Sequence, residues 1–167
     1  MAATSKDLIF LMLKTAHGLL RVVISGKGLA RVEFCPKKSL LKNSPENVGS
    51  VAAEWIQEIR NRAAGKSPKM KLPLDLHGTP FQKAVWRALC KIPHGEVRSY
   101  QEIAESIGKP RAVRAVANAC GANRIGILVP CHRVIHKDGK LGGYYWGPKR
   151  KRQLLEQEGV LLPLTSS

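Results

Sequence analysis

The residues best suited to chemistry are a cysteine and a histidine that stand side by side, within the segment PCHRV at 130–134. A thiolate is the reactive form of cysteine, and an imidazole can accept the thiol proton directly or through one water. A carboxylate behind the imidazole would orient it, as in catalytic triads. The Cys131-His132 pair alone is weak evidence, because free cysteines are among the most often buried residues. A core cysteine therefore stays an alternative at this point.

The sequence around Cys131 favours a reactive sulfur. Cys131 follows an apolar run, ILV at 127–129, which we expect to be a buried extended segment, and then a proline. Between Lys109 and Lys137 there are several Lys and Arg residues and no Asp or Glu. Nearby positive charge favours a thiolate. Such a stretch also repels itself unless it meets an anion.

The whole chain is strongly basic. Its 167 residues include 28 Lys and Arg against 12 Asp and Glu, a net charge of +16. This favours a polyanionic partner, nucleic acid first and a membrane surface second, while a generally basic solvated surface is the alternative. No apolar run is long enough to cross a membrane, and the first residues lack a signal-peptide pattern. We expect an intracellular protein, cytoplasmic or, in a eukaryote, nuclear.

The four cysteines give no sign of a metal site. They stand at 35, 90, 120 and 131, without a C-x-x-C pair or zinc-type spacing. We expect free thiols, no metal and no cofactor. Helical spacing predicts that Cys120 faces the core and that Cys90 packs on the helix that contains it.

The pattern of elements predicts an α+β protein with two domains, 1–75 and 76–167. In the first, three β-like runs at 8–14, 19–25 and 29–34 are separated by glycines, which predicts an antiparallel meander. A helix from Val51 to about Gly65 follows, with Val51, Trp55, Ile56 and Ile59 at helical spacing. Residues 66–78 are a proline-containing linker with room for a short edge strand.

The second domain is mainly helical. Thr79-Pro80 opens a helix with Phe81, Val85, Leu89 and Ile92 on one face. Ser99-x-x-Glu102 is a capping box for a helix that ends at Gly108, and Pro110 starts another that ends at Gly121. Two short helices joined by a tight turn predict a helix-turn-helix. A last helix covers Pro148 to Glu158, with a basic face and Leu154 and Leu155 inward.

The second helix of that pair has a polar face suited to DNA. Arg111, Arg114 and Asn118 lie on it, where side chains of a recognition helix contact phosphates or bases. Ala112, Ala115 and Ala119 are small enough to allow close approach to a groove. An ordinary helix pair with a solvated basic face is the alternative.

These segments together resemble one family. The stretch LPLDLHGTPFQKAVWRALCKIPHGEVRSYQEIA, then IGKPRAVRAVANACGAN, ILVPCHRVI and GYYWGPKRKRQLLEQEG, is similar to the O6-alkylguanine-DNA alkyltransferases. The resemblance covers about residues 72–159. The three strands and helix before it are similar, by pattern only, to the family's ribonuclease-H-like N-terminal domain.

The resemblance implies a role for each matching residue. Cys131 would accept the alkyl group, His132 would move a proton through a water, and Glu158 would be its carboxylate partner. Asn123 matches a hinge asparagine, and Tyr100 a tyrosine that lines the base pocket and assists flipping. The remaining pocket residues would be Val134, Tyr144 and Tyr145, where Trp146 could narrow the space for large alkyl groups. Arg114 matches an arginine finger, and the other DNA contacts would be Arg111, Ala112, Ala115, Asn118 and Ser99.

The implied reaction fits elementary chemistry. A sulfur cannot approach the O6 alkyl carbon in line while the base is stacked, so the base must be flipped out of the duplex. Small residues and an inserted arginine suit minor-groove binding. A thioether is stable, so we expect a single-turnover reagent, acting as a monomer on double-stranded DNA that contains O6-alkylguanine. A sensor that flips the base without transfer is an alternative that Cys131 argues against. A Cys-His hydrolase would need an oxyanion hole and turnover.

Overall fold

A computed structural model describes residues 8–35 and 49–162 of the chain, which divides into two compact units. The first unit runs to His77 and also takes in Arg124–Leu128. The second comprises Gly78–Asn123 and the residues from Val129 onward. From the sequence we expected 124–128 to lie in the second domain; the segment just before the candidate nucleophile instead belongs with the first unit.

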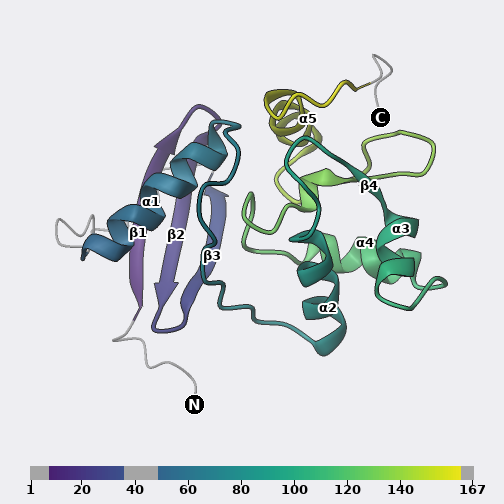
Figure 1. The fold of residues 1–167 in the computed structure, drawn as a ribbon, viewed down its shortest axis with the longest axis horizontal. Helices are drawn as coiled ribbons and strands as arrows, with labels where there is room; N and C mark the ends of the chain where they lie inside the picture. Colours follow the sequence, from purple (N-terminus) through teal and green to yellow (C-terminus); the bar gives the residue numbers. More distant parts are fainter. Residues whose placement is uncertain (1–7, 36–48, 163–167) are drawn as a thin grey trace. The chain divides into compact units, whose positions relative to one another are not determined.

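The first unit contains the predicted three-stranded meander (Figure 1). Strands β1 (Ile9–Thr15), β2 (Gly18–Ser25) and β3 (Gly28–Cys35) are antiparallel in the order β1-β2-β3, and α1 (Ser50–Ala63) follows. The core of this unit includes Leu20, Val22, Leu29, Val32 and Ile59, all fully buried. Val51, which we expected on the inward face of α1, is 57% exposed, because it lies in the first turn of the helix.

Two segments from later in the chain pair with β3. Leu29 exchanges backbone hydrogen bonds with Pro73 and Asp75, so the edge strand expected in the linker is a single bridge at Leu74. A β-carbon at Gly28 would lie 2.5 Å from the Pro73 carbonyl oxygen, so only glycine fits there. Val32 donates to the Arg124 carbonyl at 2.9 Å and accepts from the Gly126 N–H at 2.8 Å. These bonds explain why 124–128 groups with the sheet.

The second unit opens with α2 (Pro80–Leu89), capped by Thr79 in a capping box with Gln82. The Trp86 indole N–H donates to the Ala119 carbonyl at 2.8 Å, which holds α2 against a later helix. Because α2 ends at Leu89, Ile92 lies beyond it, although its side chain is buried. Cys90 is exposed at the end of α2, so the prediction that it packs on this helix is wrong.

Three further helices and a two-stranded sheet complete this unit. They are α3 (Tyr100–Ser106), α4 (Val113–Gly121), α5 (Pro148–Gln157), and parallel strands β4 (Arg98–Ser99) and β5 (Val134–Ile135). The capping box of Ser99 and Glu102 is present as predicted. Helix α4 starts at Val113 rather than at Pro110, because the Lys109 carbonyl accepts from the Ala112 N–H in a turn at 2.9 Å.

The described residues therefore form an α+β fold with one three-stranded antiparallel sheet and five α-helices, as the sequence predicted. None of these helices combines the length and the apolar character needed to cross a lipid bilayer.

Candidate active site

Cys131 lies at the start of a short 3-10 helix, η2 (Cys131–Arg133), which leads directly into β5. The run at 127–129 before it is buried, as expected, but it is not extended. Ile127 has a φ of 70°, and the Cys131 N–H donates to the Val129 carbonyl at 2.8 Å. These local turns place a 4% exposed Cys131 in the protein interior.

Asn123 links the end of α4 to the cysteine. Its side-chain amide donates to the Val129 carbonyl at 3.0 Å and to the Cys131 sulfur at 3.3 Å. Asn123 is 2% exposed, so these bonds are shielded from water. The asparagine therefore fixes the backbone before Cys131 and places a hydrogen-bond donor against its sulfur.

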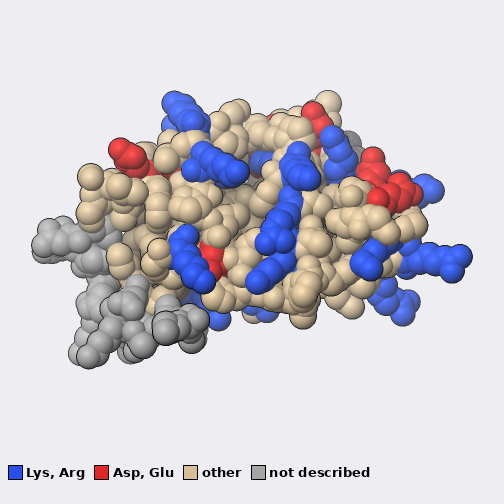
Figure 2. Space-filling model, turned by 60° about the horizontal axis from the view of Figure 1, so that its bottom comes forward, with Lys and Arg blue, Asp and Glu red and all other residues tan. Residues whose placement is uncertain are grey.

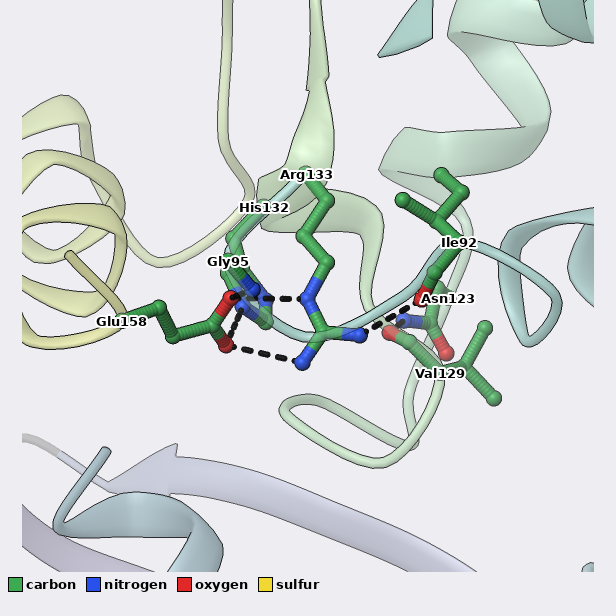
Figure 3. Close-up of polar contacts among 7 residues, drawn as sticks. All are labelled: Ile92, Gly95, Asn123, Val129, His132, Arg133 and Glu158. Carbon is green, nitrogen blue, oxygen red and sulfur yellow. Dashed lines mark hydrogen bonds and ion pairs between the residues drawn. The ribbon is translucent and has the colours of Figure 1, made fainter. Parts of the chain in front are cut away.

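Glu158, which follows α5, lies against His132 (Figure 3). One carboxylate oxygen, Oε1, is 2.8 Å from His132 Nε2, and both side chains are almost completely buried. Burial alone would raise the pKa of Glu158, but hydrogen bonds from His132 and Arg133 outweigh it and hold the pKa at about 2. Burial lowers the pKa of His132 below its ordinary value. The pair is therefore an ionised carboxylate beside a neutral imidazole.

A cavity of about 240 Å³ opens beside the cysteine. Its lining combines aromatic side chains, small residues and both interior thiols: Tyr100, Ala117, Cys120, Gly121, Cys131, His136, Gly143, Tyr144 and Tyr145. Trp146 is not part of this lining; its ring packs edge-on against Tyr144 and Tyr145, at 5.4 Å and 5.2 Å between centroids. Apolar walls with a few polar groups are typical of pockets that bind small molecules.

Two tyrosine hydroxyls in this wall keep their protons. Burial raises the pKa of Tyr100 and of Tyr144 well above the ordinary value. The Tyr144 hydroxyl is buried and has no hydrogen-bond partner among the described residues. Both side chains therefore stay neutral and keep a hydroxyl proton that can be donated in a hydrogen bond.

Sequence reasoning missed two charged residues at this site. Lys151 is completely buried, and its ammonium donates to the carbonyls of Val134 at 2.6 Å and Gly143 at 3.1 Å. Burial lowers the pKa of Lys151 to about 8. Its spacing from Leu154 and Leu155 places Lys151 on the inward face of α5, not on the basic face expected for this helix. The other is Arg133, whose partner Glu158 lies 25 residues later.

The residues expected to contact DNA lie on and around α4. Arg114, Ala115 and Asn118 are exposed on the helix, Ala112 is its N-cap, and Ser99 is the N-cap of α3. Arg111 is exposed but lies in the turn before α4, not on the helix. Ala119, expected on the same face, is only 2% exposed, and its carbonyl accepts a hydrogen bond from Trp86 of α2.

Comparison with known proteins shows the family to which the chain belongs. A family model described as "6-O-methylguanine DNA methyltransferase, DNA binding domain" matches residues 80–160. A methylated-DNA–protein-cysteine methyltransferase of Methanosarcina barkeri is 44% identical over 142 residues, which cover 79% of this chain and 85% of that protein. The chain belongs to the methylated-DNA–protein-cysteine methyltransferase family.

Two further matches are to a solved structure and to a regulatory protein. A crystal structure of Mycobacterium tuberculosis OGT in complex with DNA is 42% identical, with a TM-score of 0.77 over 89% of this chain and 91% of that one. The regulatory protein ada of Salmonella typhimurium is 61% identical over 109 residues. The chain spans only 31% of that protein's length and 30% of its Escherichia coli counterpart's.

Proposed function

We propose that this protein flips O6-alkylguanine out of duplex DNA and moves the alkyl group irreversibly to its own Cys131. The observation that carries the proposal is the cysteine in the wall of the 240 Å³ cavity, with the His132–Glu158 pair next to it in the same unit. The match with the Methanosarcina barkeri methyltransferase, which covers 85% of that protein, supports the same class of reaction.

In the proposed reaction, Glu158 accepts from His132 Nε2–H, which leaves His132 Nδ1 to take the thiol proton through a water. The Cys131 sulfur then attacks the alkyl carbon, an S–C bond forms, and the C–O6 bond breaks with its electrons passing to guanine. Tyr100 supports the leaving base with a hydrogen bond, and the proton held by His132 balances the charge of the departing guanine. The thioether product has no route back, so each protein reacts once.

We infer that α3 and α4 act as a helix-turn-helix whose second helix enters the minor groove, with one monomer on each lesion. The exposed α4 residues Arg114, Ala115 and Asn118 support this, as does the net charge of +16. Most of the charge visible on the face in Figure 2 comes from Lys and Arg. The order β1-β2-β3 followed by α1 is compatible with a ribonuclease-H-like first unit, which we propose as its finer classification.

Replacing Arg114 with alanine is expected to slow repair of duplex DNA much more than reaction with the free O6-methylguanine base. The side chain is exposed and lies outside the cavity lining, so its proposed task is to fill the gap that the flipped base leaves. Rates measured on both substrates check this, with Arg87→Ala, an exposed arginine of α2, as the matched control. Equal losses on the two substrates would remove Arg114 from this role.

Methylation of Cys131 is expected to lower the free energy of unfolding by about 1–3 kcal/mol. The sulfur is buried and accepts a hydrogen bond from Asn123, and a methyl thioether is both larger and a weaker acceptor. Thermal or denaturant melts of the reacted and unreacted protein measure the difference. An unchanged or higher stability after reaction contradicts the expectation.

The proposed function is tested with a duplex that contains one O6-methylguanine. Nucleoside analysis should show guanine restored in an amount equal to the protein added, and no more at longer times. Tight binding without restored guanine would favour a damage sensor. Restoration beyond one equivalent would favour a true catalyst, and either result contradicts single-turnover transfer.

A further inference from the structure

Glu158 has donors on both of its carboxylate oxygens (Figure 3). Oε1 accepts from His132 Nε2 at 2.8 Å and from Arg133 Nη2 at 2.9 Å. Oε2 accepts from Arg133 Nε at 2.8 Å and from the Gly95 N–H at 3.3 Å. A carboxylate offers about four lone-pair positions, so every one of them is occupied. A proton on either oxygen would have to displace one of these donors.

Arg133 is held rigidly in this arrangement. Its third nitrogen, Nη1, donates to the Ile92 carbonyl at 2.8 Å, so the guanidinium is anchored on the side away from Glu158. The side chains of Arg133 and Glu158 are only 9% and 6% exposed, which leaves little water to screen the pair. A two-point contact between guanidinium and carboxylate is both stronger and more directional than a contact with a lysine ammonium.

The charges around His132 come from several elements. Its titration is influenced by Glu158, by Arg133 and by Lys151, and the ring is fully buried next to Cys131. The ionised carboxylate can only accept, so Nε2 carries the ring proton. Nδ1 has no hydrogen-bond partner among the described residues. A buried carboxylate by itself would draw a second proton onto the imidazole, whereas Arg133 and Lys151 oppose that proton.

We propose that Arg133 is a positioning residue that compensates the charge of Glu158 and thereby keeps His132 a neutral, Nε2-protonated base. In this state Nδ1 can take the proton of Cys131, while a doubly protonated ring could take none. The inference rests on the alkyl transfer proposed above, since it explains how the base of that reaction stays available. It concerns the resting protein, so its test does not depend on transfer occurring.

The first measurement is long-range ¹H–¹⁵N NMR of the histidine rings in the full chain, from about pH 5 to about pH 8, the range in which an ordinary histidine titrates. The His132 ring should remain neutral, with its proton on Nε2, at every pH. In Arg133→Gln, its double protonation should occur about 1 pH unit or more higher than in the wild-type protein. The acid side of the pH–rate profile for methyl transfer should move by the same amount. Arg133→Lys should lie between, because lysine keeps the charge but loses the two-point contact.

Several outcomes would overturn the assignment. One is a wild-type His132 that titrates near the ordinary value of about 6.5, or that carries its proton on Nδ1. This measurement tests the proposal even if the variants fail to fold. Another is an equal shift of the His132 protonation pH in Arg133→Gln and Arg133→Lys, since the positive charge at position 133 would then have no effect. A neutral, Nε2-protonated His132 in a protein that transfers no methyl group would support the role of Arg133 and contradict the proposed function instead.

Discussion

Replacing Cys131 with alanine is expected to abolish alkyl transfer completely, while the protein still folds and binds DNA. The sulfur is the atom that forms the new bond, and no other side chain supplies an equivalent atom beside His132 and Asn123 in the described structure. Transfer is measured as methyl groups gained per protein after incubation with O6-methylguanine duplex.

The matched control is Cys90→Ala. Cys90 is exposed at the end of α2 and takes no part in the cavity lining, so this variant should transfer at the wild-type rate. Residual transfer by Cys131→Ala would show that a second thiol can act as acceptor. Cys120 is the relevant one, because it lines the same cavity. Burial raises its pKa to about 12, which keeps it in the unreactive thiol form.

Replacing Glu158 with glutamine is expected to cause the second largest loss. The amide cannot compensate the guanidinium of Arg133, and one uncompensated buried charge costs about 3–5 kcal/mol of folding free energy. The imidazole of His132 also loses the acceptor that orients it, and transfer should slow by about 10²–10⁴-fold. Denaturant unfolding and single-turnover rates measure the two effects separately.

The control for this variant lies two residues earlier, in the last turn of α5. Glu156 is exposed and only weakly paired with Arg152, at 3.9 Å, so Glu156→Gln should change stability by no more than about 0.5 kcal/mol. A Glu158→Gln protein with wild-type stability and wild-type rate would show that the buried carboxylate does nothing for the site.

The same carboxylate predicts how stability depends on pH. The pKa of Glu158 is about 2 in the folded protein and about 4.5 in the unfolded chain. Its contribution is therefore fully present above pH 4.5 and is lost as the pH falls toward 2. His132 also lowers the stability of the folded protein as the pH falls below about 6.5. Its pKa is lowered in the folded protein, so the unfolded chain takes up the proton first. Unfolding measured from neutral to acid pH should show a smaller decline in Glu158→Gln.

The features that sequence predicted correctly are local ones. The three strands follow from apolar runs between glycines, the start of α2 follows from Thr79-Pro80, and the capping box at Ser99 follows from side chains that bond within one turn. The start of α4 was three residues off, because the Lys109 turn competes with the first helical turn at Pro110.

The features that sequence did not predict depend on distant segments. Arg133 bonds to Glu158, 25 residues away, and to the Ile92 carbonyl, 41 residues away. No local sequence pattern therefore reveals the hydrogen bonds of Arg133 with Glu158. The exposure of Cys90 likewise depends on where α2 ends and on what packs there. The burial of Lys151 could be predicted from sequence, because a charged residue at helical spacing from two inward leucines predicts a buried or snorkelling ammonium.

The most direct test is to find which sulfur carries the methyl group. The protein is reacted to completion with O6-methylguanine duplex, digested, and its cysteine-containing peptides are sequenced by tandem mass spectrometry. We expect one methyl group per chain, on Cys131 only, and an unmodified Cys120. A methyl group on Cys120 or Cys90, or an unmodified Cys131 after guanine has been restored, would contradict it.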